Sequence, residues 1–554
     1  MKGKTGRWSP LAAATGAMLT LSALGAEGAE RPAWTAGIVT DTHVGTTRES
    51  CARVEMAMRL FAGRGVDLFV HCGDIADRHC PEGYRLLREI FEREFAARRP
   101  RELWVYAYHD WMDRRSEPFE TVMADVRSLL KAPNDLYGSF DLQGWPIVSF
   151  PQYFDEKKLK PLLDAAVAAH PDRPVLLFGH EPPLGCADDA VTWGSSALRR
   201  ILAKYPQVVY VNGHAHSSLR SELNVWQGEF TSVNAGCLQT WTGHAVGASP
   251  NGKPSFGVLL LEAYRDRLVF RRFDVRSGRE YAADRPWTIP LPFDPATAPY
   301  RRDRQAAAEP KPQFAPGARL ALKTDAPFTT LTVRIPRAEA PGGCYRYQVE
   351  MLSGERGMSS RGDVFGQFYL EESDRRPFVT FAMNSGYFEP GREYAVRVTP
   401  CNCFGGAGTP LETTFVSPQP RRGETLLEVA EPIGKLTFFA DNELTRPVGP
   451  TDGWMAGSGG ARFWMPVAIE GTGSYRVTFS AETDQPGPRT LALHMREAVS
   501  NRPLSSRIQT VEGRNGPVRY SIDFKRKVAD GRLSLAFEGV SGRFRIANLR
   551  IERF

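Results

Sequence analysis

Five short stretches of this 554-residue chain place aspartate and histidine side chains just after runs of apolar residues. Imidazole and carboxylate groups are ligands for divalent transition metals, and a carboxylate can bridge two ions. The pattern therefore predicts a two-metal hydrolytic centre. In chain order, the stretches are Asp41-Thr42-His43, Gly73-Asp74, His109-Asp110, Gly179-His180 and Gly213-His214-Ala215-His216.

The apolar runs before these stretches predict the strands that must position the polar side chains. Strand ends that converge on one edge of a sheet are where α/β proteins place ligand sites. Spaced apolar positions predict helices over 53–62, 84–97 and 158–169, and alternation of strands with helices indicates a layered α/β domain. The predicted strands cover residues 37–39, 68–70, 103–106, 176–178 and 208–211.

From residue 35 to 290 the order of these motifs resembles that of the calcineurin-like metallophosphoesterase family. That family carries D-x-H, then G-D-x-x-D, G-N-H-D/E, a lone histidine and G-H-x-H. This chain matches with Asp41-Thr42-His43, Gly73-Asp74-Ile75-Ala76-Asp77, His180 and Gly213-His214-Ala215-His216. The resemblance implies a layered α/β/β/α fold in which two packed sheets are flanked by helices.

The resemblance also implies a role for each matching residue. Asp74 would bridge two divalent or trivalent transition metals, Mn, Fe or Zn. His109 would contact the phosphate and help to protonate the leaving oxygen, while Asp110 would orient its imidazole. Taken singly, such residues are usually turn caps or solvated side chains, but turn chemistry gives no reason for histidine at four of five motifs. The implied ligands are Asp41, His43, Asp74 and His216 for the first metal, and Asp74, His180 and His214 for the second.

One motif departs from the family pattern, because Tyr108 stands where the family has an asparagine ligand. Two interpretations are open: a metal-bound tyrosinate replaces the asparagine, or Tyr108 packs over the cleft and the second metal binds without it. Arg78 and Asn234 are weaker candidates for substrate binding. The alternative for Arg78 is a structural position at the start of a helix.

Net charge, the N-terminal segment and the cysteine count limit the class of protein. The net charge is +7 without a compact Lys/Arg run, so nucleic-acid binding is not indicated. Lys2, Lys4 and Arg7 precede an uncharged stretch, which predicts a signal peptide over 1–26, with an uncleaved anchor as the alternative. The mature chain is expected to be exported, periplasmic or secreted, without a membrane span. Eight cysteines make disulfides an expectation in such a compartment.

The remainder of the chain predicts two all-β sandwich domains. Residues 291–319 are rich in proline and alanine and predict a linker. Residues 320–418 resemble a fibronectin type III domain, with Tyr394 placed for a tyrosine corner. Residues 424–554 alternate like a jelly roll and are similar to carbohydrate-binding modules. There, Trp454, Phe463 and Trp464 could stack on a sugar, although such aromatic side chains more commonly pack in a core.

Two functional hypotheses follow. The first is an exported metal-dependent phosphoesterase that hydrolyses a phosphate monoester or diester, either of a small molecule or linked to a glycan, with a metal-activated water. The alternative is a non-catalytic or weakly catalytic protein that binds a glycan or surface and whose metal site has drifted. Tyr108 favours the alternative, whereas His109 beside Asp110 favours the enzyme.

Overall fold

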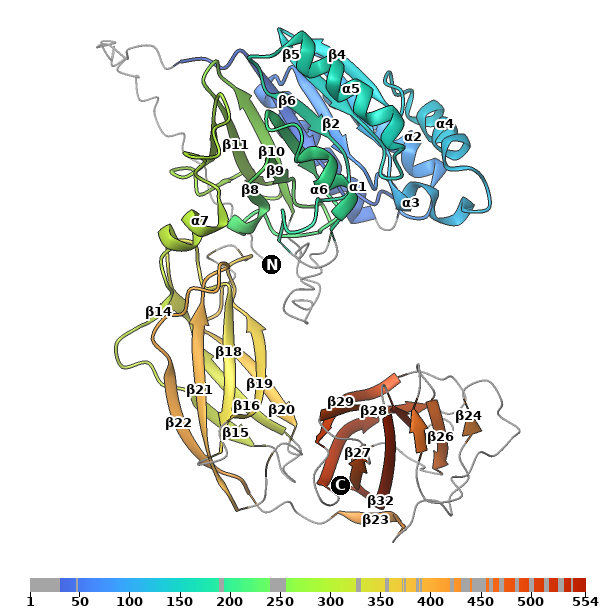
Figure 1. Cartoon of the computed structure of the whole chain (residues 1–554), viewed down its shortest axis with the longest axis vertical. Helices are drawn as coiled ribbons and strands as arrows, with labels where there is room; N and C mark the ends of the chain where they lie inside the picture. Colours follow the sequence, from blue (N-terminus) through green and yellow to red (C-terminus); the bar gives the residue numbers. More distant parts are fainter. Residues whose placement is uncertain are drawn as a thin grey trace, which may run out of the picture.

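A computed structural model of the chain gives the fold (Figure 1). The predicted signal peptide, residues 1–26, and Trp454 lie outside the described residues. The structure describes residues 30–45, 48–188, 194–239, 256–324, 330–353, 358–370, 372, 375–384, 388, 391–418, 423–429, 439–440, 455–457, 462–467, 473–483, 488–497, 503–512, 518–526, 533–539 and 542–554.

The N-terminal region contains two mixed sheets. In the seven-stranded sheet the order is β12-β11-β10-β1-β2-β3, with β13 paired to β11. In the six-stranded sheet it is β4-β5-β6-β7-β9-β8. The strands β1, β2 and β3 run parallel, as do β5, β6, β7 and β9. The bounds in the first sheet are β1 Trp34–Val39, β2 Leu68–Cys72, β3 Arg101–Val105, β10 Gly257–Ala263, β11 Arg267–Asp274, β12 Glu280–Tyr281 and β13 Trp287–Pro290; those in the second are β4 Gly138–Leu142, β5 Trp145–Ser149, β6 Val175–Phe178, β7 Val208–Asn212, β8 Val225–Gln227 and β9 Thr231–Asn234.

Burial on both faces explains why the central strands are apolar throughout. Along β2, Leu68 and Val70 face the second sheet, where they join Leu176 and Val211 in one core. Phe69, between them, packs on the opposite side in the core shared with the outer helices. The layers are therefore helix, sheet, sheet, helix, as predicted. The first sheet is covered by α1 Arg48–Arg64, α2 Pro81–Glu94 and α4 Phe119–Leu130, and the second by α5 Glu156–Ala169 and α6 Ser196–Leu202.

Two antiparallel β sandwiches follow along the chain, coloured yellow to red in Figure 1. The first has sheets β15-β16-β20 and β19-β18-β21-β22, and Tyr394 is buried in its core. Its membership of the fibronectin type III family stays a prediction. The second has sheets β23-β32-β27-β30, with β25 beside β32, and β24-β26-β31-β28-β29. The bounds are β15 Ala321–Thr324, β16 Thr330–Pro336, β18 Arg346–Leu352, β19 Met358–Phe365, β20 Phe378–Asn384, β21 Glu393–Cys401, β22 Leu411–Val416, β23 Glu424–Val429, β24 Phe439–Ala440, β25 Met455–Gly457, β26 Arg462–Val467, β27 Gly473–Thr483, β28 Pro488–Glu497, β29 Pro503–Glu512, β30 Val518–Arg526, β31 Leu533–Gly539 and β32 Gly542–Arg553.

The segment expected to be a linker contains regular secondary structure. It contains the helix α7 Arg302–Ala308 and the short strand β14 Gln313–Phe314, which pairs with β17 Ala338–Glu339. The guanidinium of Arg302 donates to the carbonyls of Leu223 and Val225, which are on the α/β region. A proline-rich composition predicted the end of one domain but not these long-range hydrogen bonds.

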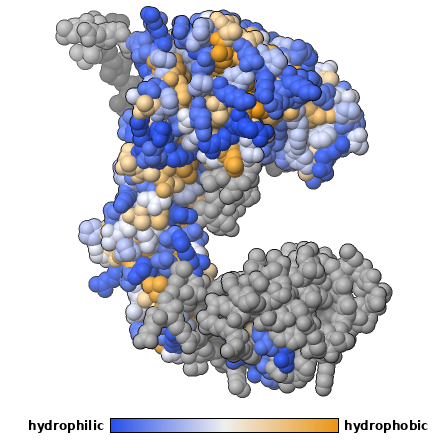
Figure 2. Space-filling view, in the orientation of Figure 1, coloured by the Kyte–Doolittle hydropathy of each residue, from blue (hydrophilic) through white to orange (hydrophobic). Residues whose placement is uncertain are grey.

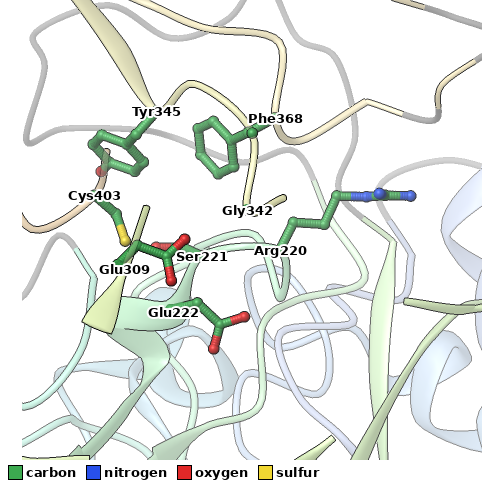
Figure 3. A pocket seen from close by; sticks show the side chains of 9 residues that line it. Arg220, Ser221, Glu222, Glu309, Gly342, Tyr345, Phe368 and Cys403 are labelled. Carbon is green, nitrogen blue, oxygen red and sulfur yellow. The ribbon is translucent and has the colours of Figure 1, made fainter. Parts of the chain in front are cut away.

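Further contacts join the α/β region to the first sandwich. The Tyr345 hydroxyl donates to Asp188 Oδ1 over 2.8 Å. Figure 3 shows a small hollow at this junction, where Tyr345 and Phe368 of the sandwich lie opposite Glu222 of the α/β region. The Tyr345–Asp188 hydrogen bond attaches the sandwich to the loop that follows His180.

Two other sequence expectations can be compared with the structure. All eight cysteines are free thiols, so the expected disulfides are absent. In the part of the chain that the structure describes, no helix combines the length and apolar character needed to cross a membrane. On the face that Figure 2 shows, the described residues are mostly hydrophilic, with apolar residues among them.

Candidate metal centre

Four of the predicted ligands occupy the same position relative to a strand. Asp41 and Asp74 each come two residues after the ends of β1 and β2, in the first sheet. His180 and His214 come two residues after β6 and β7, in the second sheet. Because these are the carboxyl ends of parallel strands, the four loops meet at one edge of the paired sheets.

The loops bring the predicted ligands into two groups that share Asp74. Within each group, one ligand atom per residue lies within 4.8 Å of every other. Asp74 Oδ2 lies 3.1 Å from His180 Nε2 and 4.0 Å from His43 Nε2, so one oxygen faces both groups. A bridging carboxylate requires this arrangement. The first group is Asp41, His43, Asp74 and His216, and the second is Asp74, His180 and His214.

Neighbouring groups fix the orientation of the ligand side chains. His180 Nδ1 donates to the Cys72 carbonyl over 2.7 Å, which leaves Nε2 as the ring nitrogen that faces Asp74. The Asp41 Oδ2 atom accepts from the Thr40 hydroxyl and from the His214 backbone N–H. Such outer hydrogen bonds hold the ligand atoms in place for a metal.

The donor set fits a pair of cations. Asp41 Oδ1 is fully buried and accepts no hydrogen bond of good geometry, although His216 Nε2 lies 3.1 Å from it. The Nε2 atoms of His43 and His216 face each other over 3.2 Å. Converging lone pairs and a buried carboxylate oxygen are stabilised by a cation between them. Three or four nitrogen and oxygen ligands per group suit a transition metal.

The backbone at the centre is held in an uncommon conformation. Five of the six predicted ligands have positive φ angles, with values from 42° at His43 to 67° at His214. Left-handed residues other than glycine cost about 1–3 kcal/mol each, and they concentrate at functional sites. Gly73 also has a positive φ, and a Cβ there would lie 2.6 Å from His180 Nδ1. The strained conformations therefore occur at the residues whose ligand atoms converge. The five residues are Asp41, His43, Asp74, His214 and His216.

The carboxylates of the centre are ionised despite their burial. Burial raises the pKa of Asp41 and of Asp74, but nearby imidazoles outweigh it and hold both pKa values well below the usual range. Burial lowers the pKa of His180, yet the charges of Asp74 and Asp41 raise it to about 9. Two buried anions therefore create the negative potential that attracts cations.

Comparison with models of known families assigns this part of the chain. Residues 35–218 match the family model described as calcineurin-like phosphoesterase. These residues form a calcineurin-like phosphoesterase domain. The His/Asp groups described above lie within this domain.

Three solved structures illustrate the similarity. A dimetal phosphatase from Danio rerio is 15% identical, with a TM-score of 0.35 over 47% of this chain and 99% of that chain. A purple acid phosphatase from yellow lupin (Lupinus luteus) seeds is 14% identical, with a TM-score of 0.33 over 46% and 53%. The CBM22-1 xylan-binding domain of Paenibacillus barcinonensis Xyn10C is 10% identical, with a TM-score of 0.18 over 24% and 97%. A comparison with curated proteins finds no match.

His109 of the phosphoesterase domain has a different carboxylate partner from the one expected. Its Nδ1 lies 2.8 Å from Asp77 Oδ1, and Asp77 also lies 3.8 Å from His43 Nδ1. The imidazoles of His43 and His109 lower the pKa of Asp77 to about 2. Asp77 thus positions both a predicted ligand and the predicted acid.

Asp110 has a structural role instead, which corrects its predicted pairing with His109. Its carboxylate accepts from the backbone N–H groups of Ala76 and Ala107 and from the Tyr84 hydroxyl. Burial and the charge of Asp74 raise the pKa of Asp110 to about 7. Asp110 joins the loop that carries Asp74 to the loop that carries His109.

The Asp77→Asn variant is predicted to lose activity without losing its fold. Asparagine retains an acceptor for the His109 ring but removes the negative charge beside it, so kcat should fall about 10- to 100-fold. Steady-state phosphoester hydrolysis and circular dichroism measure the two effects. A kcat equal to that of the unaltered protein would show that Asp77 does not position His109.

The contacts of Tyr108 are those of a packed side chain and not those of a metal ligand. Its hydroxyl accepts from Arg115 Nη1 over 3.0 Å, and its backbone N–H donates to Gln152 Oε1 over 2.8 Å. The ring lies 5.6 Å from the His109 ring, centroid to centroid. Tyr108 is therefore part of the wall beside His109, which agrees with the packing interpretation.

The two weaker substrate-binding candidates have other partners. Arg78 is 61% exposed and pairs with Asp113 on the surface. Asn234 is fully buried, and its Nδ2 donates to the carbonyl of Gly213 and to Asn212 Oδ1. Asn234 supports the turn that precedes His214, which corrects its prediction as a substrate contact. Substrate binding by Arg78 stays a prediction.

Proposed function

We propose that this protein is an exported metallophosphoesterase that hydrolyses a phosphate monoester or diester at a two-metal centre. The observation that carries the proposal is the pair of ligand groups joined by Asp74, with five of its residues in left-handed conformations. Residues in such strained conformations concentrate at functional sites.

Two sets of residues would hold the two metal ions. Asp41, His43, Asp74 and His216 would hold one ion, and Asp74, His180 and His214 would hold the other. Manganese, iron or zinc, when bound, supplies an acidified water and neutralises charge on the phosphoryl oxygens.

His109, 30% exposed beside the centre, donates a proton to the leaving oxygen. Asp77 holds the His109 ring by its Nδ1, which leaves Nε2 for the substrate. The backbone N–H of His109 donates to Asp74 Oδ1 over 3.0 Å, which fixes the acid relative to the bridging carboxylate.

Metal dependence tests the proposal. The mature chain, depleted of metal with a chelator and then given manganese, iron or zinc, is predicted to release alcohol from monoester or diester substrates only after metal is restored. Activity that is equal with and without bound metal would contradict the proposal. The panel should contain both ester types, because the metal centre serves either reaction.

The finer predictions from the sequence also remain proposals. These are export by the segment 1–26 and a division into units 35–290, 320–418 and 424–554. For the last unit we propose contact with a carbohydrate, supported by the aromatic residues Trp454, Phe463 and Trp464 in its sequence. The side chains of these residues lie outside the described part of the chain. Retention of the full chain on insoluble polysaccharide, lost in Trp464→Ala, is the test.

A further inference from the structure

Aromatic side chains form a row that leads outward from the metal centre. The row starts at the predicted ligand His43, whose ring lies 4.5 Å from that of His109, centroid to centroid. The next steps are 5.6 Å from His109 to Tyr108 and 6.5 Å from Tyr108 to Tyr153. Tyr153 therefore stands on the outer side of the acid, where the alcohol part of a phosphoester would leave.

Tyr153 combines exposure with a fixed position. It is 45% exposed, and it is the only one of four exposed large apolar side chains, among the residues the structure describes, that adjoins the centre. Trp111 and Phe119 each contact its ring edge-to-face at 5.4 Å. An exposed ring held by neighbouring rings is prepared to stack on a ligand at little cost in entropy.

The backbone links this aromatic face to the catalytic loop. Gln152, next to Tyr153, accepts from the Tyr108 N–H through its side chain and donates its own N–H to the Tyr106 carbonyl over 3.0 Å. Burial, the Tyr108 phenol and the carboxylates of Asp74 and Glu181 raise the pKa of Tyr153, so its hydroxyl is neutral. The two Gln152 hydrogen bonds thus join the segment that carries Tyr153 to the loop that carries Tyr108 and His109.

We propose that Tyr153, buttressed by Tyr108, Trp111 and Phe119, is a subsite for a ring in the alcohol part of the substrate. The class of substrate is then a phosphoester whose alcohol presents a flat ring face, either a nucleobase or a sugar. This inference rests on the proposed function, because the phosphoryl group would occupy the metal centre. A tyrosine face stacks on both kinds of ring.

Binding of non-hydrolysable ligands tests the subsite apart from catalysis. The probes are three phosphonates in which CH₂ replaces the ester oxygen of adenosine 5′-monophosphate, glucose 6-phosphate and glycerol 3-phosphate. All three are analogues of esters of primary alcohols, so they differ in the ring and not in the phosphoryl group. Calorimetry on the metal-loaded full chain should show at least one ring-bearing phosphonate binding about tenfold more tightly than the glycerol analogue.

Variants at Tyr153 identify the source of that preference. Tyr153→Ala should remove the tenfold preference and leave the Kd of the glycerol analogue unchanged, whereas Tyr153→Phe should retain the preference. Leu86→Ala is the matched control, because Leu86 is 39% exposed on α2 and is not part of the aromatic row. The adenosine and glucose arms distinguish a base from a sugar.

Each other result has a defined meaning. Equal Kd values for all three phosphonates, in a protein that hydrolyses phosphoesters, would overturn the subsite and leave the proposed function intact. An equal loss of affinity for all three phosphonates in Tyr153→Ala would also overturn the subsite, since the ring would then support the fold. Failure of the metal-loaded chain to bind any phosphonate would contradict the subsite and the monoester form of the proposed function, and the metal-dependence test with diesters would then decide the diester form.

Discussion

Asp74→Asn is expected to abolish phosphoester hydrolysis. Asp74 is the one residue common to both ligand groups, and its Oδ2 faces His180 and His43. Asparagine has almost the same shape and can still accept the His109 N–H, so the loop should keep its position. What is lost is the charge that bridges two ions. Activity should fall by more than the roughly 100-fold that loss of an outer hydrogen-bond partner costs.

The control for this substitution is Asp113→Asn. Asp113 is 50% exposed and pairs with Arg78 outside the centre, so its change should leave activity and metal content unaltered. Elemental analysis of Asp74→Asn should show fewer bound ions than the unaltered chain. Full activity in Asp74→Asn would mean that hydrolysis occurs at another site.

His109→Ala is expected to have the second largest effect, because it removes the proposed acid. The kcat for an alkyl phosphoester should fall about 10²- to 10⁴-fold. Metal content should stay the same, since His109 belongs to neither of the ligand groups that share Asp74.

The leaving group distinguishes an acid from a structural residue. A 4-nitrophenyl ester leaves as a stable anion and needs little protonation, so the loss in His109→Ala should be much smaller with it than with an alkyl ester. The same large loss with both esters would show that His109 acts in some way other than as the acid.

The sequence predicted which residues the structure brings together, because four of the six predicted ligands follow a strand end directly. An apolar run followed after two residues by Asp41, Asp74, His180 or His214 gives both the strand and the position of its ligand. Parallel strands then bring residues distant in sequence to one edge. The layered fold followed from the same alternation of apolar runs and helical patterns.

The partners of His109 could not be assigned from the order of residues alone. Asp110 is its neighbour in sequence, but it lies in the first turn of the short helix α3 Tyr108–Trp111 and accepts the Ala107 N–H. Asp77, 32 positions earlier, reaches His109 because the loops after β2 and β3 lie side by side. The Gly-Asp-x-x-Asp spacing was the available signal, since it puts a second carboxylate in the loop of Asp74.

Asn234 and Tyr153 are two further residues whose contacts could not be predicted from the sequence. Asn234 sits beside the turn of His214, as its sequence position suggested, but burial directs its amide to the backbone. Tyr153 has no motif around it, and only the contacts of its ring with Tyr108, Trp111 and Phe119 connect it to the centre. Side-chain direction and exposure depend on tertiary packing, which local patterns do not encode.

The most direct test of the two-metal centre is the metal content of the purified mature chain, measured by elemental mass spectrometry after production in cells supplied with manganese, iron and zinc. Two ions per chain are predicted, because the structure provides two ligand groups around Asp74 without a contribution from the missing asparagine. One ion per chain, or none, would contradict the two-metal mechanism.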